Sequence, residues 1–377
     1  MVPKARSGHR MITDEHGNVY VLGGYNPEEE DTSGLLKDMW KFNFALQRWS
    51  PINSGGNFPQ KLCSFAALSV DDCMFVHGGT GIPFAYDKSR SLYVCKLKLG
   101  SWSKIRLEGT GKDRPLRLYG QAIAFDADDL CIYSVGGTTG EAYVMNVYKY
   151  DLKSRQSFIL DEQTSSHNAP VGRYRHEIVL HQKKIYVFGG GTETNVFRLD
   201  KVINTIKNAG KKSYVSILAS SQLPVFDLAA RTWSYQKTFP DDTSNFPRPR
   251  KCHGCVSLGN KVFIVGGRGD NYICDDLWRF DIETSQWTLI AKMPIPLFFH
   301  AVSTSPAGLM TIFGGAQNLD NPIRRTKSFF SLWLTVPPLK ELAWYTFLNH
   351  CPNIVNMSYN QLYDLGIPKS YLARLYD

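Results

Sequence analysis

The chain alternates short apolar runs with turn residues at a regular spacing. A β-branched or aromatic run ending in Gly-Gly occurs six times, as "VYVLGG", "MFVHGG", "IYSVGG", "IYVFGG", "VFIVGG" and "MTIFGG". Each is followed by a second run with an aromatic centre: "DMWKF", "SLYVC", "NVYKY", "PVFDL", "DLWRF" and "SLWLT". Short β-branched and aromatic runs bounded by glycine are typical of strands. The pattern therefore predicts an all-β repeat protein.

The period of the repeat identifies the architecture. The Gly-Gly pairs end at Gly24, Gly79, Gly137, Gly190, Gly267 and Gly315. Most neighbouring pairs are thus roughly 50 residues apart, which is the period of kelch repeats. A further aromatic residue follows in most repeats, at Trp49, Trp102, Phe158, Trp233 and Trp287. Four antiparallel strands form a blade whose two faces pack on its neighbours. Residues 1–336 therefore resemble a six-bladed kelch β-propeller, in which these glycines and aromatics are structural.

Two irregularities interrupt this pattern. The fourth repeat carries a basic insert at about 201–222, "KVINTIKNAGKKSYVSILASSQ". The insert either overhangs a binding face or is a tolerated surface insertion. The sixth repeat turns into a predicted helix before it supplies a fourth strand, and the few residues before "RSGH" are too short to pair well with it. We expect either an imperfectly closed ring or a chain that begins further upstream.

The positive charge of the chain lies in the propeller. The formal net charge is +9, whereas residues 336–377 hold equal numbers of bases and acids: Lys340, Lys369, Arg374, Glu341, Asp364 and Asp377. The segments that open the repeats, aligned on a recurring histidine or its equivalent, share a cation three residues earlier in five of the six cases: Arg6, Lys61, Arg117, Arg173 and Arg250. We predict that these residues form a ring of positive charge at the channel mouth, joined by Arg175 and Arg268.

Such a ring indicates an anionic ligand. The guanidinium fork binds carboxylate or phosphate in a bidentate manner, and Tyr25, Tyr119 and Tyr174 are expected beside it. The alternative is that single arginines only tie loops together. Nucleic acid is the weaker interpretation, because the cations gather at a mouth rather than in a run and no nucleic-acid motif is present. We expect no nucleic-acid partner.

The sequence gives little support for an enzyme. The histidines His9, His176, His253 and His300 recur at one repeat position, which favours structural hydrogen bonds over catalysis. No nucleophile elbow, phosphate loop or cluster of histidines and carboxylates is found, so we expect no catalytic residue, no cofactor and no metal. Eight scattered cysteines with one C-x-x-C and no apolar leader in "MVPKARSGHR" favour a reducing compartment. No apolar run reaches the roughly 18 residues of a membrane span, and we expect no membrane partner.

Residues 337–377 form a predicted helical tail. In "PPLKELAWYTFLNHCPNI", two prolines end the last strand and begin a helix that is apolar nearly all round, which predicts burial nearly all round. Two further helices are predicted, one from the N-cap Ser358 to Gly366 and one that begins at Pro368. Some forty residues bury too little surface to fold with confidence alone. The tail therefore requires the propeller or a partner.

The tail resembles the docking segment of ubiquitin ligase receptors. The elongin-binding box of those receptors has the form small-or-Pro, Leu, three residues, Cys, three residues, apolar, and the matching positions here are Pro338, Leu339, Ala343 and Phe347. Alanine thus stands where cysteine is usual. The cullin-2 box that follows has the form apolar-Pro-x-x-apolar-x-x-x-apolar, and "IPKSYLARL" matches it at Ile367, Pro368, Tyr371 and Leu375.

The chain as a whole resembles the kelch-repeat substrate receptors of cullin-2 ubiquitin ligases, through "RSGH", "GGTGIPF", "YGQA", "GGTTG", "RYRHE", "ELAW" and "PNI". The resemblance implies a non-catalytic adaptor in the cytoplasm and nucleus, with elongin B/C, cullin-2 and a RING subunit as partners. Such receptors bind the C-termini of substrate proteins, often ending in Gly or Ala, through the free carboxylate, and direct them to ubiquitination and proteasomal degradation. Their carboxylate anchors are an Arg directly after a Gly-Gly, matched by Arg268, and a Ser in the next repeat opening, where Phe298 stands.

A kelch scaffold is the alternative function. Such a protein would bind signalling or cytoskeletal proteins through its loops, and the tail would only close the stack of blades. Truncation at Val336 distinguishes the two functions: the truncated protein should be insoluble if the tail helps to fold the propeller, and should remain a soluble ring if the tail is a docking segment.

Overall fold

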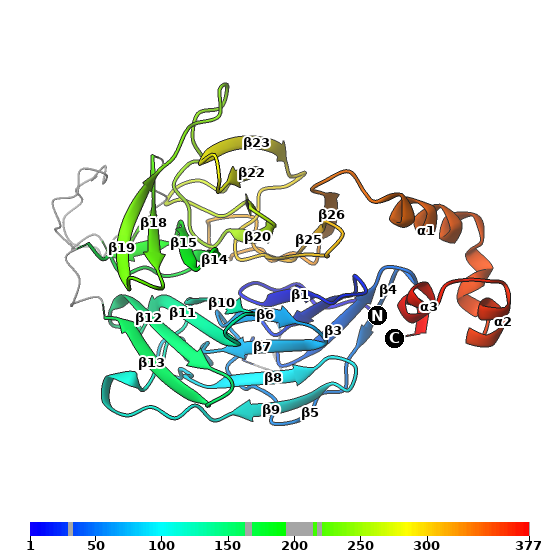
Figure 1. The fold of residues 1–377 in the computed structure, drawn as a ribbon, viewed down its shortest axis with the longest axis horizontal. Coiled ribbons are helices and arrows are strands. Elements are labelled where there is room, and N and C mark those ends of the chain that lie inside the picture. The colour runs from blue at the N-terminus through cyan, green and yellow to red at the C-terminus, as the bar shows by residue number, and fades with distance from the viewer. Residues whose placement is uncertain (29–32, 163–167, 194–213, 217–220, 377) are drawn as a thin grey trace.

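The computed structural model describes residues 1–28, 33–162, 168–193, 214–216 and 221–376. Six sheets are arranged around a central channel, and a short helical tail leaves the last sheet (Figure 1). The predicted six-bladed β-propeller is therefore confirmed. The last helix of the tail lies beside the first blade, where Asn43 donates to the carbonyl of Arg374 (Figure 1).

Blades one to three each contain a four-stranded antiparallel meander. Blade one comprises β1 (Arg10–Thr13), β2 (Val19–Leu22), β3 (Met39–Asn43) and β4 (Arg48–Pro51). Blade two comprises β6 (Ala66–Val70), β7 (Cys73–His77), β8 (Leu92–Lys96) and β9 (Ser101–Ile105), with β5 (Gly55–Gly56) added in parallel to β9. Blade three comprises β10 (Ala122–Asp126), β11 (Cys131–Thr138), β12 (Tyr143–Asp151) and β13 (Gln156–Asp161), preceded by the 3₁₀ helix η2 (Gly111–Asp113).

Blades four and five repeat the same order of strands. Blade four comprises β14 (Glu177–His181), β15 (Lys184–Phe188), β18 (Gln222–Asp227) and β19 (Thr232–Lys237). Blade five comprises β20 (Gly254–Leu258), β21 (Lys261–Val265), β22 (Asp276–Asp281) and β23 (Gln286–Lys292). Most of the predicted insert at 201–222 lies outside the described residues. Its described part is β17 (Tyr214–Ser216), which pairs with β16 (Gly191–Glu193), and the start of β18.

Blade six has three strands in the described part of the chain, β24 (Ala301–Thr304), β25 (Leu309–Phe313) and β26 (Phe329–Trp333). The ring nevertheless closes at its inner edge. His9 of blade one donates from Nε2 to the carbonyl of Phe313 at 3.0 Å, and His176 of blade four makes the equivalent bond to Val135 of blade three. The junction between blades six and one therefore repeats the junctions elsewhere, and the structural role predicted for these two histidines is confirmed.

A circle of backbone hydrogen bonds surrounds the channel. One residue in each blade donates its N–H to the carbonyl of its counterpart in the preceding blade, over distances of 2.6 to 3.1 Å. These residues are Gly8, Ser64, Gly120, Arg175, Cys252 and Phe299. All six have left-handed backbone angles, with φ between 55° and 70°. We call this the inner circle, and it is complete at the channel. At the outer edge, blade six lacks a fourth strand in the described part of the chain, as the sequence led us to expect.

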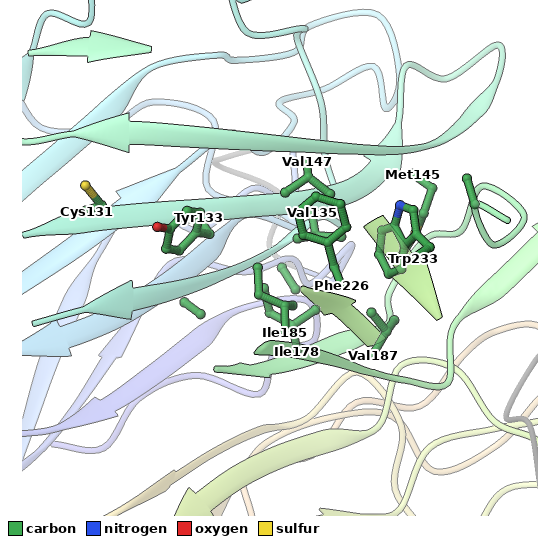
Figure 2. Packing of buried hydrophobic residues seen from close by; sticks show 13 residues of the cluster. Cys131, Tyr133, Val135, Met145, Val147, Ile178, Ile185, Val187, Phe226 and Trp233 are labelled. Carbon is green, nitrogen blue, oxygen red and sulfur yellow. The ribbon is translucent and has the colours of Figure 1, made fainter. Parts of the chain in front are cut away.

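The interfaces between blades form the hydrophobic core. Figure 2 shows the cluster between blades three and four, where Val135 and Val147 face Ile185, Val187 and other apolar side chains. Trp233 completes this cluster and donates from Nε1 to Asp161 at 2.9 Å. The Gly-Gly pairs allow this close packing, because a Cβ on Gly190 would lie 2.8 Å from the Cβ of His176.

The tail forms a small helical unit at the side of the ring (Figure 1). It contains α1 (Leu339–His350), the 3₁₀ helix η3 (Pro352–Asn356), α2 (Tyr359–Asp364) and α3 (Lys369–Tyr376). Ser358 caps α2 in a reciprocal capping box with Gln361, as expected of an N-cap serine. The buried apolar side chains of the described tail are Trp344, Ile354, Leu362, Leu372 and Leu375, and they pack against Ala45 and Leu46 of blade one.

Candidate functional site

A cavity of about 300 Å³ lies at one mouth of the channel, directly over the inner circle. Its lining comes from the repeat openings of five blades and from residues that follow the Gly-Gly pairs. In each opening the chain turns at the left-handed inner-circle residue before it enters the first strand, so the residues at the turn face the axis. Irregular segments on a rigid β scaffold are common places for binding sites. We call this space the mouth cavity.

The three predicted tyrosines all line the mouth cavity. Tyr25 follows the first Gly-Gly pair, while Tyr119 and Tyr174 come from the openings of blades three and four, with their ring centroids 5.6 Å apart. Burial raises the pKa of Tyr174 to about 12, so its hydroxyl keeps its proton at neutral pH. The wall is thus aromatic, with hydroxyl groups able to donate hydrogen bonds.

Arg175 is buried beneath this cavity and contacts two of its lining residues. Its side chain extends from blade four across the channel, and Nη2 donates to the Ser64 hydroxyl at 2.7 Å and toward the Gly8 carbonyl at 3.4 Å. The guanidinium carbon lies 4.8 Å from the centre of the Phe299 ring. Glycine in the inner circle makes room for it, since a Cβ on Gly8 would lie 3.2 Å from Arg175 Nη2. The structure therefore places this predicted residue at the cavity.

An ion pair joins two opposite blades across the channel. The six residues that begin the innermost strands are small except for two, Arg10 of blade one and Glu177 of blade four. Arg10 Nη1 donates to Glu177 Oε1 at 2.8 Å, and both side chains are largely buried. Because Arg10 neutralises Glu177, this carboxylate does not cancel the charge of the arginines at the cavity.

The predicted ring of cations is wrong at three positions, where the residue three before the histidine or its equivalent is buried between blades. Arg6 and Arg250 are fully buried and bind their own carboxylates in a bidentate manner, Arg6 to Asp38 at 2.6 and 2.9 Å and Arg250 to Asp276. Arg173, 3% exposed, donates to the carbonyl of Gly189 at 3.2 Å, and burial lowers its pKa to about 10. These arginines are structural ties and do not line the cavity.

Two further members of the predicted ring result from a slip of one residue in the alignment. Blades two and three have no histidine in their openings, and its place is taken by Phe65 and Gln121, whose Cβ atoms face the Gly-Gly pairs as the histidines do elsewhere. The equivalents of Arg6 are therefore leucines, at 62 and 118. Arg117 is exposed outside the cavity, and Lys61 forms an ion pair with Asp87.

Arg268 follows a Gly-Gly pair as predicted but is directed toward its own loop. Its Nε donates to the Gly269 carbonyl at 2.9 Å and Nη2 donates to the Asp270 carbonyl at 3.2 Å. Its guanidinium carbon lies 5.3 Å from the centre of the Phe298 ring, and it is Phe298 that lines the cavity. An aromatic ring thus occupies the position for which the resemblance implies a serine anchor.

One cation of the cavity was missed by the sequence analysis. Arg325 lies in the loop before β26, and its Nε donates to the Ser7 hydroxyl at 3.0 Å across the junction between blades six and one. The other repeats have no arginine at the position equivalent to Arg325, so the periodicity of the sequence does not predict this residue. The only hint was the "RR" pair close to the last Gly-Gly.

The elongin-box residues of the tail lie on different faces of α1. Leu339 is 81% exposed, and Leu342 and Ala343 are exposed beside it. Trp344 is buried in the tail core, while Phe347 is half-buried against it and Pro338 lies at the junction with the propeller. The helix is therefore covered on one side only, which corrects the prediction of burial nearly all round.

The cullin-box residues are mostly internal to the tail. Leu375 is buried, Ile367 packs on the same core, and the Tyr371 ring stacks on Trp344 with centroids 4.8 Å apart. Pro368 alone among the four is exposed. The four residues therefore do not form a common exposed face, because the small tail uses three of them to build its own core.

A buried ion pair fixes the tail to itself and to the propeller. Arg374 of α3 donates to both carboxylate oxygens of Glu341 on α1, at 2.7 and 2.8 Å. Asn43 of blade one donates from its side-chain amide to the Arg374 carbonyl at 2.8 Å. The pKa of Glu341 is lowered, chiefly because Arg374 donates these hydrogen bonds. These contacts therefore fix the orientation of α1, and with it the exposed leucines, relative to the propeller.

None of the described helices is long and apolar enough to cross a membrane. Among the same residues, no three His, Cys, Asp or Glu side chains are grouped so that they could hold a metal ion.

Comparison with known proteins agrees with the fold. Residues 1–190 and 209–332 match the model of the KLHDC2/KLHL20/DRC7 Kelch-repeats domain. The chain is 36% identical to kelch domain-containing protein 10 of Xenopus tropicalis over 99% of its own length and 86% of that protein. The identity to the Homo sapiens protein of the same name is also 36%, over 99% of this chain and 80% of that protein. The Drosophila melanogaster homolog is 34% identical over 99% of this chain and 62% of its own length. The chain therefore belongs to the kelch-repeat proteins and, within them, to the family of kelch domain-containing protein 10.

Proposed function

We propose that this protein is the substrate-recognition subunit of a cullin-2, elongin B/C and RING ubiquitin ligase. It is a non-catalytic adaptor: the mouth cavity binds the C-terminus of a substrate protein, and the tail docks on the ligase for ubiquitination and proteasomal degradation. The observation that carries the proposal is the exposure of Leu339 and Leu342, 81% and 44%, on a helix whose other face is packed. Exposed leucines on an ordered helix favour a partner that covers them.

The mouth cavity supports the choice of ligand. Arg325 lines it, Arg175 is hydrogen-bonded to its lining residue Ser64, and none of its described lining residues is acidic. A volume of about 300 Å³ is small for a ligand site and suits the end of a chain better than a folded surface. A free terminal carboxylate with a small last residue would match the charge and the size.

The docking claim is tested by co-purification with elongin B/C. We expect Leu339→Asp to reduce recovery of elongin by about tenfold or more, because an exposed hydrophobic anchor would become a charge in a desolvated interface. Asn349→Asp, at an exposed position on the same helix, is the matched control and should recover elongin as well as the wild type. Equal recovery with Leu339→Asp would reject the docking claim and favour the scaffold.

The substrate claim is tested with peptide pools. One pool has random C-terminal residues and a free carboxylate, and the other is the same pool with amidated ends. We expect the wild-type protein to retain peptides from the free pool and few from the amidated pool, since amidation removes the charge that the arginines would bind. Equal retention of both pools would reject carboxylate recognition.

A further inference from the structure

Arg325 has an incomplete set of hydrogen-bond partners. Nε donates to the Ser7 hydroxyl at 3.0 Å and Nη1 donates to the Ile323 carbonyl at 2.9 Å. Nη2 has no partner in the described part of the chain. The guanidinium carbon lies 5.0 Å from the centre of the Tyr25 ring, so the group is held against one wall of the mouth cavity. A planar donor fixed on two sides leaves the remaining N–H groups oriented for an acceptor.

Arg325 also has no hydrogen-bonded carboxylate in the described part of the chain, where Glu28 acts on its charge only through space. Burial lowers the pKa of Arg325, which is the effect of placing a cation in a half-buried site without a bound carboxylate. Its environment differs from those of Arg6 and Arg250, which each bind an aspartate through two hydrogen bonds. An anion that entered the cavity would supply to Arg325 what Asp38 and Asp276 supply to the structural arginines.

We infer that Arg325, held in place by Ser7, is the residue that anchors the terminal carboxylate of the substrate. This inference rests on the proposed function and specifies its chemistry. The anchor thereby moves from Arg268 of blade five, which donates to its own loop, to the junction of blades six and one.

The arrangement around Arg325 adds a second positive charge and limits the size of the last residue. Arg175 and Arg325 both act electrostatically on the Cys63 thiol, which lines the cavity, so their fields overlap at this point. The Phe84 ring packs edge-on against Tyr25 with centroids 4.9 Å apart, next to the cation. A carboxylate beside Arg325 would therefore have aromatic rings close to its α-carbon, which favours a small terminal side chain.

The test compares three arginine variants in the peptide-pool assay. Arg325→Met should lower retention of the free-carboxylate pool by about 10- to 100-fold, to the level of the amidated pool, as expected for loss of a charged hydrogen bond. Arg268→Met should change retention less than about threefold. Arg324→Met, a change at the adjacent and exposed arginine, is the matched control for loss of one positive charge. If Arg325→Met does not fold, Ser7→Ala replaces it, with an expected loss of about fivefold.

The outcomes separate this inference from the proposed function. Loss of binding in Arg268→Met with binding retained in Arg325→Met would overturn the inference and leave carboxylate recognition in place. Equal retention of the free and amidated pools by the wild type would instead overturn the proposed function. Loss confined to Arg325→Met supports both.

Discussion

The arginines at the tail junction and between the blades differ in one respect from the arginines at the mouth cavity. At the tail junction, Arg374 binds Glu341 through two hydrogen bonds, and between the blades Arg250 binds Asp276 in the same way. At the mouth cavity, Arg175 and Arg325 bind hydroxyl and carbonyl groups only. An arginine that is paired with a carboxylate of the protein stabilises the fold, whereas one without such a partner can bind the anionic group of a ligand. Arg173 also binds only carbonyl groups, but it is buried away from the cavity. The lack of a carboxylate, taken together with a place at the cavity, therefore separates candidate ligand residues from structural arginines better than position in the repeat does.

The largest expected effect comes from breaking a structural pair between blades. Asp276→Asn leaves Arg250 fully buried without a counter-ion and also weakens the acceptor for Trp278 Nε1. Removing one partner of a buried pair costs about 3–5 kcal/mol, so we expect a loss of that order in the free energy of unfolding, measured by urea denaturation. Asp270→Asn, at an exposed loop position, is the control. An unchanged midpoint for Asp276→Asn would contradict a structural role for Arg250.

A smaller effect is expected from the pair at the tail. Glu341→Gln removes the charge that Arg374 binds, and we expect a loss of roughly 1–3 kcal/mol in tail docking, because this pair is less buried than the pair of Arg250. Faster amide hydrogen exchange in α1 and α3, with unchanged exchange in the blades, is the measurement. The exposed Asp364→Asn provides the control.

The same pair makes tail docking dependent on pH. The pKa of Glu341 is lower in the folded state than in the unfolded chain, so its contribution is fully present above the unfolded value and is lost as the pH falls through the lower, folded value. We therefore expect α1 and α3 to lose protection as the pH falls below about 4.5. In Glu341→Gln this pH dependence should be absent, and a wild type that kept full protection there would contradict the assignment.

The repeat could be predicted from the sequence because its determinants are local. Gly-Gly pairs and aromatic centres mark each blade whatever the rest of the chain does, and the N-cap at Ser358 is equally local. The pairing of two arginines was also readable, since both openings that contain Arg6 or Arg250 are followed by Asp-x-Trp, as "DMW" and "DLW". A cation near an opening does not by itself indicate whether its side chain is buried.

The remaining features depend on contacts between distant segments. Arg325 reaches Ser7 across the whole length of the propeller sequence, and no period relates the two. The exposed face of α1 depends on which side of the helix meets Ile354, Leu372 and Leu375, which an apolar sequence cannot reveal when nearly every position is apolar. The cullin-box motif failed as a surface for the same reason: a motif gives residue types, but packing decides which of them remain accessible.

The smallest effect on stability is expected at Arg325, because an arginine without a carboxylate partner should contribute least to the fold. Arg325→Met should change the free energy of unfolding by less than about 1 kcal/mol in the absence of ligand. The variant loses two hydrogen bonds to neutral acceptors, but it also no longer has to desolvate a charge, so the two effects offset each other. Urea denaturation beside Arg250→Met provides the contrast, since that variant should lose stability on the scale of Asp276→Asn. Addition of the free-carboxylate peptide pool should stabilise the wild type but not Arg325→Met, because a ligand that binds only the folded state raises its stability. A loss of more than about 2 kcal/mol in Arg325→Met would place Arg325 with the structural arginines, and the distinction between those arginines and the arginines at the mouth cavity would no longer hold.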